Sequence, residues 1–380
     1  MALDRAGQEN AAFTDRINAA ALSLHQQANT RWQAVGVLYI NPAGSTHPGG
    51  ALRRQAVAKG LYILVSLALA GILALSSHLS IGGTAAERAD FGANPGRLRL
   101  FFYQPEPLKK PAPLVVALHG CQQTALEYAR LTGWLQQADR LGFMLLLPEQ
   151  RLSNNPQRCF NWFCPSQVRR DQGEAGSIRQ MIARLQTEFP IDAQRIYVAG
   201  LSAGGAMAVA LLAAYPEVFA GGASVAGVPY GCAGGMLSAL YCQFWGRDLR
   251  PAEWADKVRQ AAAEANLRPQ RWPILSIWQG QSDWVVDSSN ARELAEQWRA
   301  LHGVGIDAAS EETGQGYTRR VYHDARGQPR VESYLIAGMG HGQPIAPGSE
   351  ASSCGVAADY VLPVGICASA LILQFWGLVP

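Results

Sequence analysis

The chain has 380 residues, of which 48% are hydrophobic and 16% are charged, so it can bury a large core in one or two domains. Its formal net charge of +3 is too small to suggest a nucleic-acid partner. The sequence contains no internal repeat, no cysteine–histidine spacing typical of a metal site and no phosphate-binding loop. We therefore expect a globular protein that uses neither a metal ion nor an organic cofactor.

Residues 1–59 differ from the rest of the chain, because their apolar patches are short and follow no sustained period. We interpret them as a segment without a stable fold, or as residues upstream of the true start. A run of 15 uncharged, mostly apolar residues follows at 61–75 and extends to Ile81 if a few polar residues are allowed.

Segment 60–82 has the composition of a signal peptide or of a transmembrane signal-anchor; a buried core helix is the alternative. A signal-peptide core needs about 7–15 apolar residues and a membrane-spanning helix about 20. Basic residues before the run place its amino end in the cytoplasm, and the small residues at 82–86 offer a cleavage site. The remainder is thus predicted to be extracellular or periplasmic, with membrane attachment through 61–81 if the segment is not cleaved.

Residues 90–380 are predicted to form one α/β domain, because strand-like and helix-like runs alternate along them. Strands are expected at 97–103, 113–118, 143–147, 195–199, 273–278 and 331–336. Helices are expected at 126–140, 173–188, 203–214, 252–264 and 290–301. The continuous apolar strands predict a mostly parallel, doubly wound sheet with helices on both faces. A capping box is expected at 171–174, at the start of the second helix.

The segment Gly200-Leu-Ser-Ala-Gly204 lies between a predicted strand and a predicted helix. In an α/β-hydrolase fold, Gly-x-Ser-x-Gly in this context is the nucleophile elbow, a sharp turn that exposes the serine hydroxyl. Glycines are expected on both sides of the serine, where side chains would clash with packed neighbours. A chance match in a chain with 39 glycines is the alternative. The strand–turn–helix context favours the elbow, with Ser202 as nucleophile.

A serine nucleophile needs a base, and in this fold the order along the chain is Ser, Asp or Glu, His. Three histidines follow the elbow: His302 at a predicted helix end, His323 in a polar stretch, and His341 between glycines just after a strand. The flanking glycines let a loop present the ring, which favours His341 as the base. Surface or capping roles suit the other two.

Asp283 and Asp287 follow the predicted strand 273–278, and loops at the carboxyl ends of such strands carry active sites. Asp283 comes first and is assigned as the acid that orients the base. Asp287 is the competitor, and one of the two is free to cap the helix that begins near Ser288.

Two backbone N–H groups are expected to form the oxyanion hole, one from Ala203 after the nucleophile and one from the loop after an earlier strand. Leu118-His-Gly-Cys-Gln122 is that loop, Gly120 permits its tight turn, and the Cys121 N–H is the predicted second donor. His119 precedes the nucleophile, which favours a structural role for it.

Several segments resemble the polyhydroxybutyrate depolymerase family of esterases, over about residues 91–377. They are Phe91–Gly96, Leu118–Gln123, Cys159–Phe163, Gln172–Ala175 with Ser177–Gln180, Gly200–Ala206, Gly338–His341 and Phe375–Gly377. The resemblance implies a secreted serine esterase related to feruloyl and acetylxylan esterases, with Ser202, Asp283 and His341 as its triad. The chain departs from the family at Gln279, where relatives often carry His, and at Trp284.

The expected function is carboxylic-ester hydrolysis through an acyl-enzyme on Ser202, with hydroxybutyrate oligomers, their polymer or similar short-chain esters as substrates. The alternatives are a feruloyl or acetylxylan esterase and, from another class, a catalytically silent, membrane-tethered binding domain. Trp162 and Trp284 are predicted to line an apolar acyl pocket, and core packing is the alternative for each. Further aromatic candidates are Phe160, Phe163, Tyr230 and Trp245.

Seven cysteines in an exported chain favour disulfides, although the sequence does not fix their pairing and buried free thiols remain the alternative. The expected pairs are Cys232 with Cys242, Cys354 with Cys367 and Cys121 with Cys159, which leaves Cys164 unpaired. The sequence printed here ends at Pro380 without a Thr/Ser/Pro-rich linker. From this we expect soluble short-chain esters and oligomers to be cleaved well and crystalline polymer poorly.

Overall fold

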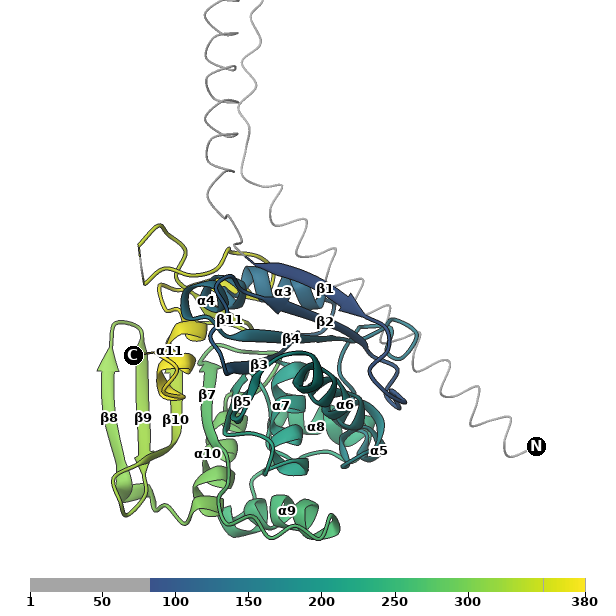
Figure 1. Cartoon of the computed structure of the whole chain (residues 1–380). Helices are drawn as coiled ribbons and strands as arrows, with labels where there is room; N and C mark the ends of the chain where they lie inside the picture. Colours follow the sequence, from purple (N-terminus) through teal and green to yellow (C-terminus); the bar gives the residue numbers. More distant parts are fainter. Residues whose placement is uncertain (1–82, 351, 380) are drawn as a thin grey trace, which may run out of the picture. The chain divides into compact units, whose positions relative to one another are not determined.

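A ten-stranded mixed sheet forms the centre of the computed structural model, which describes residues 83–350 and 352–379 (Figure 1). In spatial order the strands are β1 (Thr84–Arg88), β2 (Arg99–Gln104), β4 (Met144–Glu149), β3 (Ala112–Leu118), β5 (Ile191–Leu201), β6 (Gly221–Val225), β7 (Ile274–Gly280), β10 (Pro329–Ile336), β9 (Tyr317–His323) and β8 (Ala309–Gly314). A separate parallel pair is formed by β11 (Gln343–Ile345) and β12 (Val361–Pro363). The predictions for segments 1–59 and 60–82 lie outside the described residues.

The strands from β4 to β10 in that order run parallel, and antiparallel strands flank them at both edges. Along β3, Leu114 and Val116 join one hydrophobic cluster, whereas Val115 and Ala117 join a second one on the opposite face. Because successive side chains of a strand point to opposite faces, the sheet is buried on both sides. The predicted doubly wound α/β architecture is thus confirmed.

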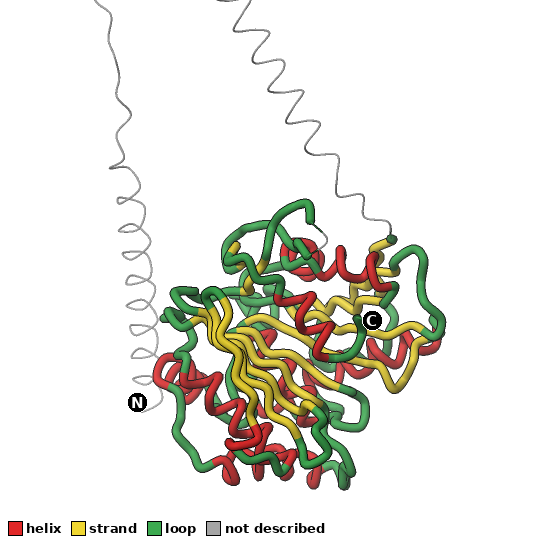
Figure 2. The backbone as a smooth tube through the Cα atoms, turned by 90° about the vertical axis from the view of Figure 1, so that its left-hand side faces the viewer, coloured by secondary structure: helices red, strands yellow, loops and turns green. Residues whose placement is uncertain are grey.

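Helices cover both faces of the sheet, as Figure 2 shows in red against the yellow strands. One face carries α6 (Gly173–Glu188), α7 (Ala203–Ala214), α9 (Pro251–Glu264) and α10 (Ser289–His302). The other carries α3 (Ala125–Leu131), α4 (Trp134–Leu141) and α11 (Ala368–Phe375). The remaining helical segments are α5 (Pro165–Val168), α8 (Met236–Trp245) and the 3₁₀ turn Ile306–Ala308.

The sequence located six of the ten sheet strands and missed β1, β6, β8 and β9. The residues of β6, Gly221-Gly-Ala-Ser-Val225, have little strand character. Small residues are needed there because the strand is closely packed on both sides. A Cβ atom on Gly221 would lie 2.6 Å from Ile274, and one on Gly222 would lie 2.6 Å from Leu212 of α7. The need for close packing therefore selects small residues at positions where a strand would normally carry β-branched or aromatic ones.

Two helix predictions differ from the structure. The helix expected at 126–140 is two helices, because Gly133 adopts φ +81° between α3 and α4. The capping box expected at 171–174 is also wrong. Gln172 is the N-cap of α6 without a side-chain bond to the helix, and the Glu174 carboxylate accepts hydrogen bonds from Gln150 and Asn161 instead.

The sheet begins before the predicted start of the domain at residue 90, since β1 pairs with β2 over residues 84–88. The cleavage site expected within 82–86 therefore overlaps this first strand. Among the helices of the described part of the chain, none combines the length and hydrophobicity needed to cross a bilayer.

Candidate active site

Ser202 lies at the junction between β5 and α7, with φ 56° and ψ −119°. Positive φ is uncommon for a residue with a side chain and marks a strained turn. Neither neighbouring glycine has room for a Cβ atom, which at Gly200 would collide with the Gly204 backbone and at Gly204 with the Leu118 carbonyl group. The expected elbow geometry is therefore present, and the glycines provide the space for it.

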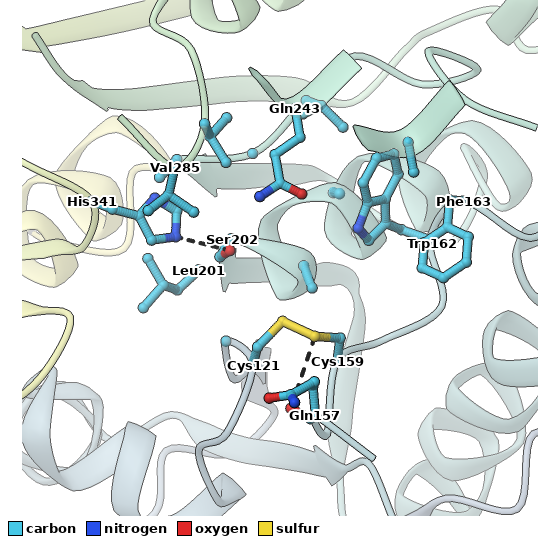
Figure 3. A pocket seen from close by; sticks show the side chains of 18 of the residues that line it. Cys121, Gln157, Cys159, Trp162, Phe163, Leu201, Ser202, Gln243, Val285 and His341 are labelled. Carbon is cyan, nitrogen blue, oxygen red and sulfur yellow. Dashed lines mark hydrogen bonds between the residues drawn. A yellow bond between two sulfur atoms is a disulfide. The ribbon is translucent and has the colours of Figure 1, made fainter. Parts of the chain in front are cut away.

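His341 links Ser202 to Asp283. Figure 3 shows the bond between His341 and Ser202. His341 Nε2 lies 3.0 Å from Ser202 Oγ, and its Nδ1 lies 2.8 Å from Asp283 Oδ2. An ionised carboxylate only accepts hydrogen bonds, so the neutral ring donates from Nδ1 and leaves Nε2 to accept from the serine hydroxyl. The structure thus brings together all three residues that the sequence singled out as a triad.

The loops that carry the aspartate and the histidine are held together because β7 and β10 are neighbours in the sheet. The Gln281 N–H donates to the Ile336 carbonyl at 2.8 Å, and the Ser282 N–H donates to the Met339 carbonyl at 2.9 Å. A Cβ atom on Gly280 would collide with the Met339 carbonyl group. Residues 58 apart in sequence are thereby fixed at hydrogen-bonding distance.

The Asp283 carboxylate is fully hydrogen-bonded by its surroundings. Its Oδ1 accepts from the N–H groups of Val285 and Val286, both at 2.9 Å. Its Oδ2 accepts from Gln279 Nε2 at 2.9 Å as well as from His341. These donors hold the carboxylate in one orientation. The departure at Gln279 therefore keeps a hydrogen-bond donor next to the acid.

The alternatives considered for acid and base lie away from this relay. Asp287 Oδ1 accepts from the Ser289 N–H at 2.9 Å and so caps α10, as expected for one of the two aspartates. His302 Nε2 lies 3.1 Å from the Pro273 carbonyl oxygen, and burial lowers the pKa of His302 to about 4. His323 ends β9, where it pairs with β10.

The two predicted oxyanion donors, the N–H groups of Cys121 and Ala203, both belong to residues that line the cavity beside Ser202. Among the hydrogen bonds of residues 83–350 and 352–379, neither N–H donates to a protein acceptor. The turn that presents Cys121 differs from expectation, because the residue with positive φ is Gln122, at 66°, and not Gly120. The Gln122 N–H donates to the Gln157 carbonyl at 2.7 Å, which fixes this turn.

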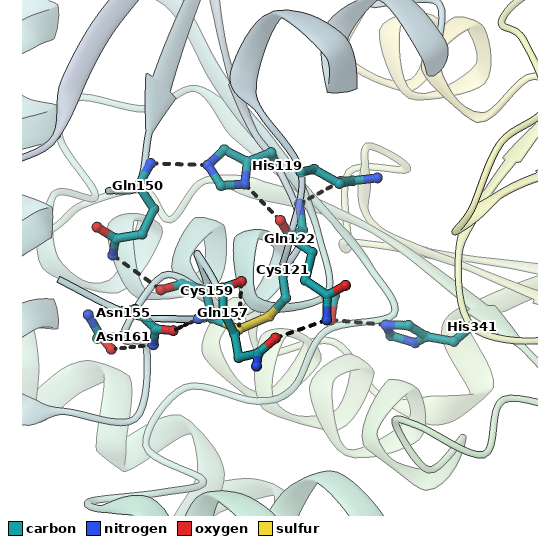
Figure 4. Close-up of a disulfide and its surroundings, with 12 residues drawn as sticks. His119, Cys121, Gln122, Gln150, Asn155, Gln157, Cys159, Asn161 and His341 are labelled. Atoms are coloured by element: carbon teal, nitrogen blue, oxygen red, sulfur yellow. Dashed lines mark hydrogen bonds between the residues drawn. A yellow bond between two sulfur atoms is a disulfide. The ribbon is translucent and has the colours of Figure 1, made fainter. Parts of the chain in front are cut away.

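Two further interactions hold the Cys121 loop (Figure 4). A disulfide joins Cys121 to Cys159. His119 is buried, its Nδ1 lies 2.7 Å from the Gly120 carbonyl oxygen, and its Nε2 accepts from the Gln150 N–H at 3.1 Å. Burial lowers the pKa of His119 to about 4, so the ring is neutral at ordinary pH. The placement agrees with the structural role expected for His119.

A cavity of about 490 Å³ opens above Ser202 and has the size of a small-molecule site. Its walls are mainly apolar and come from the loop after β4, the start of α7, the loop after β6, helix α8 and the loop after β7. Residues in its lining include Trp162, Phe163, Ala206, Val228, Met236, Leu240, Gln243, Val285, Val286 and Tyr360.

Of the two tryptophans predicted to line the pocket, the structure places only Trp162 in its wall. Trp284 is 81% exposed and lies outside the lining, one residue before Val285. Sequence reasoning missed the contribution of α8 and of Tyr360, whose ring lies 5.8 Å from that of His341. Tyr360 reaches the site because it directly precedes β12, which pairs with β11, the strand that follows His341. No residue spacing in the sequence predicts that pairing.

The other aromatic candidates have mixed positions. Phe163 lines the cavity, and Phe160 is buried in the core. Tyr230 packs against the core beneath α9 and α10, and Trp245 is exposed at the end of α8.

The family model described as esterase PHB depolymerase matches residues 100–322. The chain belongs to this family. It is 41% identical over 326 residues to a poly(3-hydroxyalkanoate) depolymerase C from Paucimonas lemoignei. The aligned region covers 86% of this chain and 78% of that protein. The resemblance noted in the sequence is thereby confirmed, and the protein is a serine esterase.

More distant relatives of this PHB depolymerase-family esterase include acetylxylan esterases. One from Coprinopsis cinerea is 31% identical over 274 residues, covering 69% of this chain and 70% of the relative. The solved structure of an acetyl xylan esterase from Aspergillus awamori superposes with a TM-score of 0.65 at 21% identity, over 78% of this chain and all of that one. This likeness supports the α/β-hydrolase fold.

The predicted disulfide pattern is confirmed. Disulfides join Cys121 to Cys159, Cys232 to Cys242 and Cys354 to Cys367, and Cys164 is free. Such bonds persist in oxidising compartments, so the esterase domain is suited to an oxidising environment. Among the described residues, no group of three or more His, Cys, Asp or Glu side chains is arranged to hold a metal ion.

Proposed function

We propose that this esterase hydrolyses short hydroxyalkanoate esters, such as hydroxybutyrate oligomers, with Ser202 as nucleophile, His341 as base and Asp283 as the orienting acid. The relay Ser202–His341–Asp283, with separations of 3.0 and 2.8 Å at the floor of an apolar cavity, is the observation that carries the proposal. The depolymerase from Paucimonas lemoignei supports the substrate class.

In the acylation step, Ser202 Oγ attacks the ester carbonyl carbon and its proton passes to His341 Nε2. The oxyanion accepts hydrogen bonds from the N–H groups of Cys121 and Ala203, which have no acceptor within the described protein. Collapse of the intermediate breaks the C–O bond, and the leaving alkoxide takes the proton from His341. Water then attacks the acyl-enzyme with His341 as base again, which releases the acid and restores Ser202.

An ester panel tests the substrate class. Hydroxybutyrate dimer and trimer are compared with feruloyl esters and acetylated xylan, at equal concentrations of active sites titrated with a fluorophosphonate. The highest kcat/KM is expected on the hydroxybutyrate oligomers. A higher value on feruloyl or acetylxylan substrates would reject the proposed substrate class while leaving the serine mechanism intact. Ser202→Ala measures the background of each assay.

We further propose that the esterase domain acts outside the cytoplasmic membrane and that residues 60–82 direct its export as signal peptide or anchor. The three disulfides support an oxidising location. Deletion of 61–81 is expected to retain the enzyme inside the cell. Amino-terminal sequencing of the exported protein then separates cleavage from anchoring, and unchanged export of the deletion variant counts against the proposal.

A further inference from the structure

Helix α8 concentrates exposed apolar side chains at the edge of the cavity. Five large hydrophobic residues that are exposed in the described chain belong to it: Met236, Leu237, Tyr241, Phe244 and Trp245. Leu237 is 76% exposed and Trp245 is 68% exposed. Exposed apolar groups gathered in this way on a soluble domain mark an interaction surface, whereas single ones do not.

The spacing of the residues gives α8 an inner face that lines the cavity and a separate, apolar outer face. Met236, Ala239, Leu240 and Gln243 recur at helical spacing and line the cavity. Leu237, Tyr241, Phe244 and Trp245 recur at the same spacing on another side, and the Trp245 ring contacts those of both Tyr241 and Phe244. We call these four residues the outer face of α8. Figure 3 shows Gln243 of this helix directed toward the cavity from the inner side.

One disulfide and two hydrogen bonds fix α8 to the rest of the domain, so its outer face has a defined position. Disulfide Cys232–Cys242 ties it to the preceding loop. The Asp287 N–H donates to the Gln243 carbonyl at 2.8 Å, and Asn290 Nδ2 donates to the Cys242 carbonyl at 2.9 Å. These bonds connect α8 to the segment between β7 and α10 that also carries Asp283. The outer face therefore has a fixed position relative to the catalytic relay.

The composition of α8 indicates what it contacts. None of the ten residues Met236–Trp245 is charged. Helices that bind membrane surfaces usually carry Lys and Arg for anionic lipids, and α8 has neither. A ten-residue helix presents a footprint of only about 150 Å², whereas a stable dimer buries about 800 Å² per partner. An uncharged apolar solid fits this face better than a bilayer or a second copy of the chain.

From this geometry we infer that the outer face of α8 adsorbs the enzyme to the surface of solid polyester whose chains are cleaved in the adjoining cavity. The inference rests on the proposed function for its substrate class. It draws on the position of both faces on one helix, since the inner face lines the cavity and the outer face is exposed beside it.

This inference leads to a different expectation from the one stated in the sequence analysis, in which crystalline polymer is a poor substrate. An apolar face beside the cavity supplies adsorption from within the esterase domain. The ratio of the initial rates on polyester film and on soluble trimer therefore distinguishes the two expectations.

The test is adsorption of the full chain to poly(3-hydroxybutyrate) film in a Ser202→Ala background, where no hydrolysis erodes the film. Tyr241→Ser with Trp245→Ser is compared with two single controls, Leu152→Ser and Ile306→Ser. The controls are also exposed hydrophobic residues, but they lie outside α8 and the cavity. Adsorption of the double variant is expected to fall by about a hundredfold or more, since burial of each of its two large apolar side chains contributes about ten- to hundredfold to binding. The controls are expected to bind like the parent.

The same substitutions are then assayed with Ser202 intact. The double variant is expected to keep its kcat/KM on soluble hydroxybutyrate trimer and to lose its rate on film. Equal adsorption of the double variant and the parent overturns the inference, as does a parent that does not adsorb. The inference is also overturned if the double variant loses binding to phosphatidylcholine–phosphatidylglycerol vesicles but still adsorbs to film. A parent dimer that the substitutions abolish would overturn it as well. Failure of the proposed function is distinct, because it appears as an unmodified enzyme that does not cleave trimer.

Discussion

The catalytic relay and the outer face of α8 border the same cavity but differ in burial and in bonding. The side chain of Asp283 is fully buried and that of His341 is 7% exposed, and each of their polar atoms within the relay has a defined partner. The outer face of α8, in contrast, consists of exposed side chains that form few directional interactions.

This difference separates two tasks of the molecule. Proton transfer requires atoms held at hydrogen-bonding distance, so the relay tolerates little change. Adsorption requires only apolar area in a fixed place. Substitutions in the relay are therefore expected to reduce hydrolysis of every ester, whereas substitutions on the outer face of α8 affect only substrates that form a surface.

The largest effect is expected from Ser202→Ala or His341→Ala. Each removes a member of the relay and is expected to lower kcat by about 10⁴- to 10⁶-fold, equally on soluble trimer and on film. Adsorption to film and the thermal unfolding midpoint are expected to stay unchanged, which separates chemistry from attachment. Near-normal turnover by folded Ser202→Ala would show that the mechanism is assigned to the wrong residue.

The next largest effect is expected from Asp283→Asn, compared with Asp287→Asn as a matched control. An amide at 283 favours the wrong histidine tautomer, which lowered kcat about 10⁴-fold in the best-studied serine protease. Asp287 instead accepts from the Ser289 N–H at the start of α10, and an asparagine oxygen can accept the same bond, so Asp287→Asn is expected to change both stability and kcat little. A larger kcat loss from the Asp287 substitution would reverse the assignment of the acid.

Removal of individual disulfides sharpens the comparison further. Replacing Cys121 and Cys159 by Ala is expected to lower stability by about 2–4 kcal/mol and also kcat, because the Cys121 loop carries a proposed oxyanion donor. Replacing Cys232 and Cys242 is expected to leave kcat on soluble trimer nearly unchanged and to weaken adsorption, since that bond fixes α8. Urea unfolding and the two assays measure these effects. Identical profiles for both pairs would contradict the separation of tasks.

The relay was predictable from sequence because its residues belong to a fixed order along one fold and occupy the ends of recognisable strands. Ser202 lies in a motif, and Asp283 and His341 each follow a strand that the sequence located. The parallel pairing of β7 with β10 then brings their loops together. Two of the three disulfide pairs, Cys232–Cys242 and Cys354–Cys367, were likewise suggested by their short loops.

The cavity wall was not predictable to the same degree, because no local pattern encodes it. Helix α8 lacks the polar face that reveals an amphipathic surface helix, so its uncharged sequence gives no clear periodicity. Tyr360 reaches the site through pairing of the short strands β11 and β12. Trp284, chosen for its place in the catalytic loop, points to solvent. These positions depend on tertiary packing, which a local pattern does not contain.

The smallest effect is expected from Glu174, a buried carboxyl group, whereas α8 contains no carboxyl group. Glu174 is 1% exposed, and it accepts hydrogen bonds from Gln150 and Asn161 that hold the loop carrying Cys159 and Trp162. Burial raises the pKa of Glu174 from 4.5 to about 7, although these donors oppose the shift. In this range the folded protein keeps a proton that the unfolded chain releases. The stability contributed by this proton is therefore fully present below about pH 4.5 and is lost as the pH rises to about 7.

The expected outcome is a fall in the free energy of unfolding between about pH 5 and 7, of about 3 kcal/mol at most from this group, since one pKa unit corresponds to about 1.4 kcal/mol. Glu174→Gln cannot ionise, so its stability is expected to be lower at acid pH but to change less with pH than that of the parent. Urea unfolding of both proteins at several pH values measures the difference in slope. Adsorption to film, which depends on an uncharged helix, is expected to remain constant over the same range. Equal slopes for the two proteins would show that Glu174 stays ionised in the folded state, held by its amide donors.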